Sequence, residues 1–137
     1  MIIVDVNVVA YLLIHGERTE AAHRVLMKDS DWWTPPIWRY EYMNLLSNYV
    51  RFKGMPLETA VSLWGLAGRL SCLRESPVVE EKSLRLSIEK GISLYDAQYL
   101  SLAESLDAVL VSGDKALCKA VPDRICFLED FAKEGPC

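Results

Sequence analysis

The chain begins with Met1-Ile2-Ile3-Val4-Asp5-Val6-Asn7-Val8, a segment that joins two structural patterns. The apolar run predicts a buried strand at about 1–5, and apolar residues at helical spacing follow from Asn7 to about Ile14. Asn7 is a suitable N-cap for that helix. A strand that passes directly into a helix is typical of an alternating α/β fold, and here an acid stands at the junction.

The same alternation continues along the rest of the chain. Helices are expected at about 17–28, 37–53, 56–70, 78–90, 93–106 and 115–120, and strands at about 32–34, 73–75, 108–111 and 125–127, with a final turn to Phe131. Strands that alternate with helices predict a parallel sheet with right-handed crossovers. Because no repeat or linker interrupts the pattern, we expect one α/β domain over residues 1–137.

Composition and charge restrict the class of protein. The 137 residues are 51% hydrophobic and 25% charged, which is typical of a globular chain. A net charge of −4 argues against nucleic-acid binding through a broad basic surface. It does not exclude a nuclease, because acids that hold a metal also lower the net charge. No segment approaches the roughly 18–20 apolar residues of a membrane span, and the first apolar run is too short for a signal peptide. We therefore expect a cytoplasmic protein without a membrane partner.

The cysteines favour reduced thiols. No C-x-x-C pair occurs among Cys72, Cys118, Cys126 and Cys137. This spacing argues against both a zinc site and a disulfide framework.

Four acids stand where a carboxylate requires a partner: Asp5, Glu41, Asp96 and Asp114. Asp5 and Asp114 follow predicted strands, and ligands of parallel sheets bind at the carboxyl ends of the strands. Glu41 and Asp96 lie in helical patterns rich in Leu, Tyr and Trp. A desolvated carboxylate is costly or becomes protonated unless it binds a cation. A cluster of these acids would indicate a hard divalent metal and phosphodiester hydrolysis.

Each of these acids also has a purely structural interpretation. Asp5 and Asp114 can cap the helices that follow them, and Ser93-Leu94-Tyr95-Asp96 matches a capping box. Asn7 and Ser112 can either orient a neighbouring carboxylate or serve as ordinary cap and turn residues. Residue types and spacing alone leave both interpretations open.

Four segments carry a likeness to a known family, and a short tail adds to it. They are Ile2-Ile3-Val4-Asp5-Val6-Asn7-Val8, Glu41-Tyr42-Met43-Asn44, Ser93-Leu94-Tyr95-Asp96-Ala97-Gln98-Tyr99 and Leu110-Val111-Ser112-Gly113-Asp114-Lys115, with the tail Leu128-Glu129-Asp130-Phe131. In this order and spacing the chain resembles the PIN-domain family, and within it the VapC-type ribonuclease toxins of toxin–antitoxin pairs. It departs from the family pattern at Val6, where a small hydroxyl residue is frequent, and at Ser112, where Thr is commoner.

The resemblance implies a fold and a metal site. The fold would be a three-layer α/β/α arrangement around a parallel sheet of about four or five strands. Mg²⁺ or Mn²⁺ would be held by Asp5, Asp96 and Asp114, and Glu41 would complete the acidic pocket. Glu41 or Asp96 would orient the attacking water. Asn7 would position Asp5, and Ser112 would position Asp114.

The resemblance also implies partners. RNA would be the substrate, a cognate antitoxin protein would neutralise the chain, and a homodimer is expected, with the apolar helical region 37–70 contributing to these protein interfaces. The candidate phosphate contacts are Arg39, Lys53, Lys115 and Lys119.

Two other functions are compatible with parts of the sequence. A non-catalytic PIN-like module that binds RNA or protein would share the fold but would not need all four acids. A phosphatase of the haloacid-dehalogenase type also has an Asp after its first strand, but it requires a second Asp two positions later, where this chain has Asn7.

Overall fold

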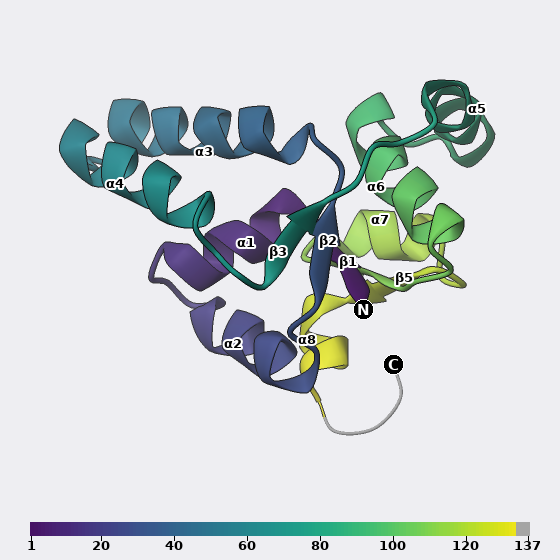
Figure 1. Cartoon of the computed structure of the whole chain (residues 1–137), viewed down its shortest axis with the longest axis horizontal. Helices are drawn as coiled ribbons and strands as arrows, with labels where there is room; N and C mark the ends of the chain where they lie inside the picture. Colours follow the sequence, from purple (N-terminus) through teal and green to yellow (C-terminus); the bar gives the residue numbers. More distant parts are fainter. Residues whose placement is uncertain (134–137) are drawn as a thin grey trace.

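A five-stranded parallel sheet forms the centre of the computed structural model, which describes residues 1–133. Its strands are β1 (Ile2–Val4), β2 (Trp32–Thr34), β3 (Leu73–Glu75), β4 (Leu110–Ser112) and β5 (Ile125–Phe127), in the spatial order β3-β2-β1-β4-β5 (Figure 1). All pairings between neighbours are parallel. The predicted parallel sheet is therefore confirmed.

Eight helices connect and cover these strands within the described residues. They are α1 (Val6–Leu13), α2 (Thr19–Lys28), α3 (Trp38–Phe52), α4 (Leu57–Ala67), α5 (Glu80–Lys90), α6 (Leu94–Ser105), α7 (Lys115–Ala120) and α8 (Leu128–Ala132). From residue 1 to residue 133, none has the length and apolar character needed to cross a bilayer.

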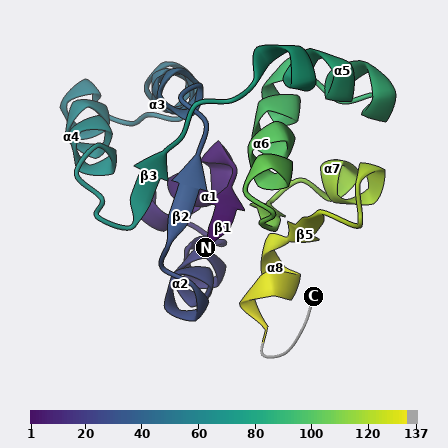
Figure 2. The ribbon, with the colours of Figure 1, turned by 45° about the vertical axis from the view of Figure 1, so that its right-hand side comes forward.

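The two faces of the sheet are buried in different cores, as the alternation of side chains along a strand requires. Ile3 and Leu110 belong to a core that includes side chains of α3, α6 and α7. Ile2, Val4 and Val111 belong to the opposite core, with side chains of α1, α2 and α8. Figure 2 shows these helices on the two sides of the strands. The fold is thus the expected three-layer α/β/α arrangement.

The order of the strands places a switch point between β1 and β4. From β1 the chain crosses to β2 on one side, whereas β4 pairs with the other side of β1, with Val4 opposite Val111. Ligands of open α/β sheets bind at the carboxyl ends of such strands. The Asp5 N–H donates to the Val111 carbonyl at 3.2 Å, so Asp5 lies directly beside the end of β4.

Several boundaries differ from those predicted: α4 ends at Ala67 rather than at about 70, and α5 begins at Glu80 rather than at about 78. Three further differences have a local cause. The N-cap of α1 is Asp5 rather than Asn7, because the Asp5 backbone is extended and its side chain accepts the Val8 N–H. α2 begins at Thr19 rather than at residue 17, since the Thr19 hydroxyl binds the Gly16 N–H in the preceding turn. The fourth strand is 110–112 and not 108–111. It starts later because Asp107 has a positive φ of 48°, so the chain turns just before it.

The expectation for the cysteines is only partly correct. Cys72 and Cys118 are free thiols. Cys126 is disulfide-bonded, so the prediction of reduced thiols is wrong at that position.

Candidate active site

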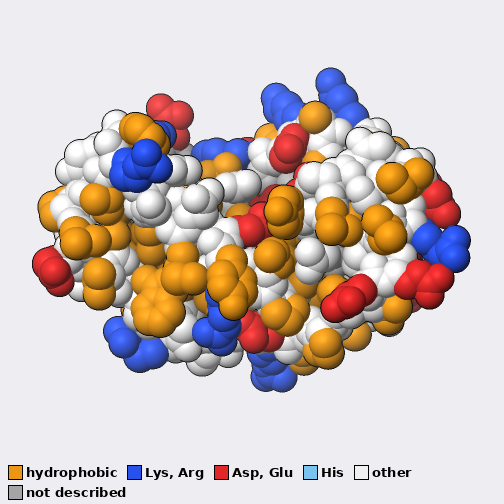
Figure 3. Space-filling view, turned by 90° about the horizontal axis from the view of Figure 1, so that it is seen from above, with side chains coloured by type: hydrophobic (Ala, Val, Ile, Leu, Met, Phe, Trp, Pro, Cys, Tyr) orange, Lys and Arg blue, Asp and Glu red, His pale blue; other side chains and the backbone are white. Residues whose placement is uncertain are grey.

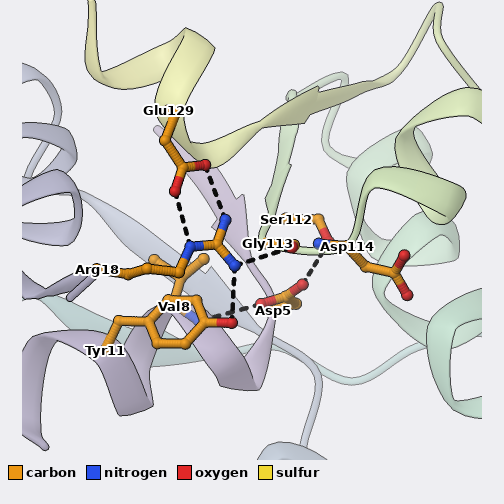
Figure 4. A network of polar contacts seen from close by, with 8 residues as sticks. All are labelled: Asp5, Val8, Tyr11, Arg18, Ser112, Gly113, Asp114 and Glu129. Atoms are coloured by element: carbon orange, nitrogen blue, oxygen red, sulfur yellow. Dashed lines mark hydrogen bonds and ion pairs between the residues drawn. The ribbon is translucent and has the colours of Figure 1, made fainter. Parts of the chain in front are cut away.

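Asp5 is a buried carboxylate at the junction of β1 and α1, with 6% of its surface exposed. Its Oδ1 accepts the Val8 N–H at 3.1 Å, and its Oδ2 accepts the Ser112 hydroxyl at 2.5 Å (Figure 4). Burial disfavours the charged form and raises the pKa of Asp5 to about 6, although these hydrogen bonds lower it. The fold therefore keeps an acid where its charge is costly without a cation.

Ser112 links Asp5 to the turn that carries Asp114. Its hydroxyl donates to Asp5 and accepts the Asp114 N–H at 3.0 Å. Asp114 in turn is the N-cap of α7, because its Oδ1 accepts the N–H groups of Ala116 and Leu117 at 2.8 and 3.2 Å. The capping interpretation of Asp114 thus holds, and Figure 4 shows its carboxylate turned away from Asp5.

Asp96 and Glu41 approach the same region from two helices. Asp96 lies in the first turn of α6, where its N–H donates to the Ser93 hydroxyl at 3.0 Å. Glu41 lies in the first turn of α3, and its Oε1 accepts the Tyr99 hydroxyl at 2.7 Å. Burial raises the pKa of both carboxyls; the charge of Asp114 adds to the rise at Asp96, and the charges of Asp96 and Asp5 add to the rise at Glu41.

The four acids therefore form one electrostatically coupled group, and the term acidic cluster is used below for Asp5, Glu41, Asp96 and Asp114. Figure 3 shows acidic side chains in a hollow between two lobes of the surface. Within residues 1–133, however, no three Asp, Glu, His or Cys side chains lie close enough to hold a metal directly. The cluster fits an ion that binds one or two carboxylates and keeps much of its water, as Mg²⁺ does.

Arg18, which sequence patterns did not identify, supports the Ser112-Gly113-Asp114 turn through hydrogen bonds. The Arg18 Nε and Nη2 donate to the two oxygens of Glu129 at 2.7 and 2.8 Å. Its Nη1 donates to the Tyr11 hydroxyl and to the Gly113 carbonyl, both at 3.0 Å (Figure 4). The Arg18 guanidinium holds the pKa of Glu129 below its usual range, as expected for a bidentate pair.

Gly113 makes this close packing possible. A Cβ at this position would lie 2.8 Å from Tyr11 Cε2 and 2.9 Å from Arg18 Nη1. Any other residue would have to displace the tyrosine ring or the guanidinium. The turn between β4 and α7 is therefore fixed by Ser112 on one side and by Arg18 on the other.

The two predicted supporting residues behave differently. Ser112 contacts both Asp5 and Asp114, as described above. Among residues 1–133, no hydrogen bond joins the Asn7 amide to Asp5, whose carboxylate is bound instead by Val8 and Ser112. Asn7 faces a pocket that also contains Glu41 and Asn44.

The four predicted phosphate contacts lie at different places. Arg39 is ion-paired with Glu75 and stacks on Trp38. Lys53 follows α3, about 18 Å along the helix from Glu41 at 1.5 Å per residue.

Lys115 begins α7 directly after Asp114, and Lys119 lies in its last turn. Lys115 is thus the basic residue of this set that is adjacent in sequence to the acidic cluster.

Sequence patterns missed three side chains that support the acids: Tyr99, Arg18 and Glu129. Tyr99 lies within the same segment as Asp96 but reads as an ordinary core residue, and it is indeed buried. Glu129 belongs to the quoted tail, yet nothing local indicates that it pairs with a residue 111 positions away. Such partners are set by the tertiary fold.

Replacing Tyr99 by Phe should destabilise the protein more at high pH than at low pH. The folded-state pKa of Glu41 is raised, so its charged form costs stability as the pH rises through that pKa, and the Tyr99 hydroxyl opposes this cost. We expect a loss of about 1–2 kcal/mol near pH 8 and a smaller loss near pH 4. Urea unfolding at the two pH values measures both. Tyr95→Phe on the same helix is the control, and an equal loss for Tyr99→Phe at both pH values would contradict the prediction.

Comparison with known proteins gives consistent results. A family model described as "PIN domain" matches residues 2–121. The protein called Ribonuclease VapC3 from Pyrobaculum aerophilum is 28% identical over 126 residues, which cover 88% of this chain and 95% of that protein.

Solved structures show the same fold. The crystal structure of PAE2754 from Pyrobaculum aerophilum has a TM-score of 0.72 at 23% identity, covering 95% of this chain and 92% of that one. A toxin–antitoxin complex from Klebsiella pneumoniae has a TM-score of 0.65 at 19% identity, covering 93% and 98%. Mycobacterium tuberculosis VapC20, described as a sarcin–ricin loop cleaving toxin, has a TM-score of 0.64 at 22% identity, covering 88% and 95%.

Proposed function

Because this chain belongs to the PIN-domain family, we propose that it is a metal-dependent endoribonuclease and the toxin of a toxin–antitoxin pair. The observation that carries the proposal is the acidic cluster at the carboxyl ends of β1 and β4, where burial and mutual repulsion raise the pKa of Asp5, Glu41 and Asp96. The name of the relative Ribonuclease VapC3 supports RNA as the substrate.

The metal of this proposal is Mg²⁺ or Mn²⁺, held by Asp5, Asp96 and Asp114. Asp5 is the best placed for direct contact, since it is buried and its orientation is fixed by Val8 and Ser112. Because the three acids do not lie close enough to bind one ion together directly, at least one of the other two would act through a bound water, in keeping with the preference of Mg²⁺ for few carboxylates. When bound, such an ion lowers the pKa of a coordinated water and stabilises charge on the phosphate oxygens.

The remaining residues of the site orient groups and hold protons. Glu41 or Asp96 orients the attacking water as an acceptor. Burial beside Glu41 raises the pKa of Tyr99 well above its usual range, so the Tyr99 hydroxyl keeps its proton and directs Glu41. Ser112 fixes the position of Asp114 relative to Asp5, and Arg18 supports this turn through its hydrogen bond to the Gly113 carbonyl.

The proposed phosphate contacts remain Arg39, Lys53, Lys115 and Lys119. Lys115 is the first choice because it follows Asp114 directly, and Arg39 would need to exchange its ion pair with Glu75 for a phosphate. Single-stranded or looped RNA is the form of substrate that best reaches acids in a hollow.

The proposed protein partners are a cognate antitoxin and a second copy of the chain. An apolar groove of about 440 Å³ between α3 and α4 supports such contacts, with Met43, Leu57, Val61 and Trp64 at its surface. The toxin–antitoxin complex among the structural neighbours supports the antitoxin. We assign the activity to the cytoplasm, where RNA is available, and treat residues 1–137 as one PIN domain, although residues 134–137 lie outside the described part.

A test of the proposal is cleavage of a single-stranded RNA by the purified chain. We expect cleavage with Mg²⁺ or Mn²⁺ and none when EDTA removes the metal, since the acids alone repel the phosphate. RNA ends are mapped by primer extension. Undiminished cleavage in EDTA would contradict metal dependence, and binding of RNA without cleavage under any metal would instead favour the non-catalytic PIN-like module.

A further inference from the structure

A pocket of about 520 Å³ adjoins the acidic cluster and shares Glu41 with it. It lies where α1, α3 and α6 begin, and its apolar part is formed by side chains that include Val6 and Ile37. Its volume falls within the range of small-molecule sites, about 300–1,000 Å³. Of its lining residues, only Glu41 has a role in the function proposed above.

Two tyrosines line the pocket with their rings open to solvent. Tyr40 in α3 is 68% exposed and Tyr95 in α6 is 56% exposed. Within residues 1–133, neither hydroxyl makes a hydrogen bond. More than half of the surface of each tyrosine is therefore open to solvent, and exposed aromatic faces at a nucleic-acid site are the surfaces on which unpaired bases stack.

Two asparagines add polar groups to the same pocket. Asn7 comes from α1 and Asn44 from α3. In the described part of the chain neither side-chain amide has a hydrogen-bond partner. Each amide offers both a donor and an acceptor, which is the combination that pairs with the edge of a nucleobase.

We propose that this pocket binds one unpaired nucleobase of a single-stranded RNA. The base stacks on Tyr40 or Tyr95, and Asn7 and Asn44 bind its edge. Because Glu41 belongs both to the pocket and to the acidic cluster, the base belongs to a nucleotide beside the phosphodiester that is cleaved. The proposal rests on the proposed ribonuclease function and adds to it a requirement for an unstacked base.

The polarity of the pocket favours a base over a protein side chain. The groove between α3 and α4 is lined mostly by apolar residues, as expected of a surface for a protein partner. The pocket at Tyr40 combines aromatic rings with amides and a carboxylate. This combination matches the mixture of flat faces and polar edges in a nucleobase.

Binding of a short RNA analogue with neutral methylphosphonate linkages tests the proposal. The analogue keeps the bases but lacks the charges that a metal would bind, so its affinity is measured in EDTA by fluorescence anisotropy. We expect Tyr40→Ala and Tyr95→Ala each to weaken binding at least about fivefold, and Tyr40→Phe and Tyr95→Phe to bind like the wild type. Phe52→Ala is the matched control, an aromatic that is 69% exposed at the other end of α3.

Equal binding by the wild type and both alanine variants would overturn the proposal, as would no binding by the wild type. Loss of binding to a protein partner, with unchanged binding of the analogue, would assign the pocket to that partner instead. These results are independent of the nuclease activity, because the assay needs neither metal nor cleavage. A chain that binds the analogue through Tyr40 and Tyr95 but never cleaves RNA would refute only the proposed function.

Discussion

Asp96→Asn is expected to lower the rate of RNA cleavage by a factor of at least about 100 while leaving the fold intact. The substitution removes one negative charge from the acidic cluster, and with it a ligand for the proposed metal or the group that orients water. It should leave the start of α6 intact, because the Asp96 backbone N–H still donates to the Ser93 hydroxyl and the Asn side-chain oxygen can accept from that hydroxyl as the Asp96 carboxylate does. Single-turnover cleavage of one RNA with saturating Mg²⁺ measures the effect.

Asp123→Asn is the matched control for this loss. Asp123 is exposed and precedes β5, so it lies at the amino ends of the parallel strands, opposite the acidic cluster. The Asp123→Asn variant has the same change in net charge as Asp96→Asn, and it should cleave RNA like the wild type. Equal rates for wild type, Asp96→Asn and Asp123→Asn would exclude the acidic cluster as the catalytic site.

Asp5→Asn is expected to stabilise the metal-free protein by about 2 kcal/mol near pH 7.5. A rise in pKa from 3.8 to about 6 corresponds to about 3 kcal/mol against the charged form. Part of this gain is offset by the altered contact with the Ser112 hydroxyl, at about 1 kcal/mol for a hydrogen bond. The cap of α1 is kept, because Asn is as good an N-cap as Asp.

The pH dependence gives this prediction its sign. The folded-state pKa of Asp5 is raised. The favourable contribution of this carboxyl to the free energy of unfolding is therefore fully present below pH 3.8, and it is lost as the pH rises through about 6. The advantage of Asp5→Asn should therefore disappear near pH 4. Urea unfolding of both proteins in EDTA measures this, with Asp123→Asn expected within about 0.5 kcal/mol of the wild type at either pH. If Asp5→Asn is less stable than the wild type near pH 7.5, the charged Asp5 carboxylate does not destabilise the fold.

The fold could be predicted from the sequence because each element has a clear local pattern. The strand at 32–34 and the helix that Ser93 caps were placed correctly, since aromatic residues and a capping serine mark them. The pairing of β1 with β4 is not predictable from local patterns, because Val4 pairs with Val111, which lies 107 positions later in the chain. That pairing is what places Asp5 beside Ser112.

The four acids of the candidate site can be picked out from the sequence, but several of the side chains that support them cannot. Asp5 and Asp114 stand out at strand ends, whereas the Tyr99 contact with Glu41 and the Arg18 pair with Glu129 join elements that are distant in sequence. The residue type of Asn7 predicts an N-cap. Asp5 takes that role, since the chain enters α1 directly from the extended end of β1.

Binding of Mn²⁺ tests most directly whether the acidic cluster is a metal site. Electron paramagnetic resonance measures the free ion as protein is added, without RNA and without catalysis. We expect the wild type and Asp123→Asn to remove Mn²⁺ from solution with equal affinity, and Asp5→Asn and Asp96→Asn to bind at least about tenfold more weakly. Equal binding by all four proteins would show that the metal, if one acts, is held elsewhere.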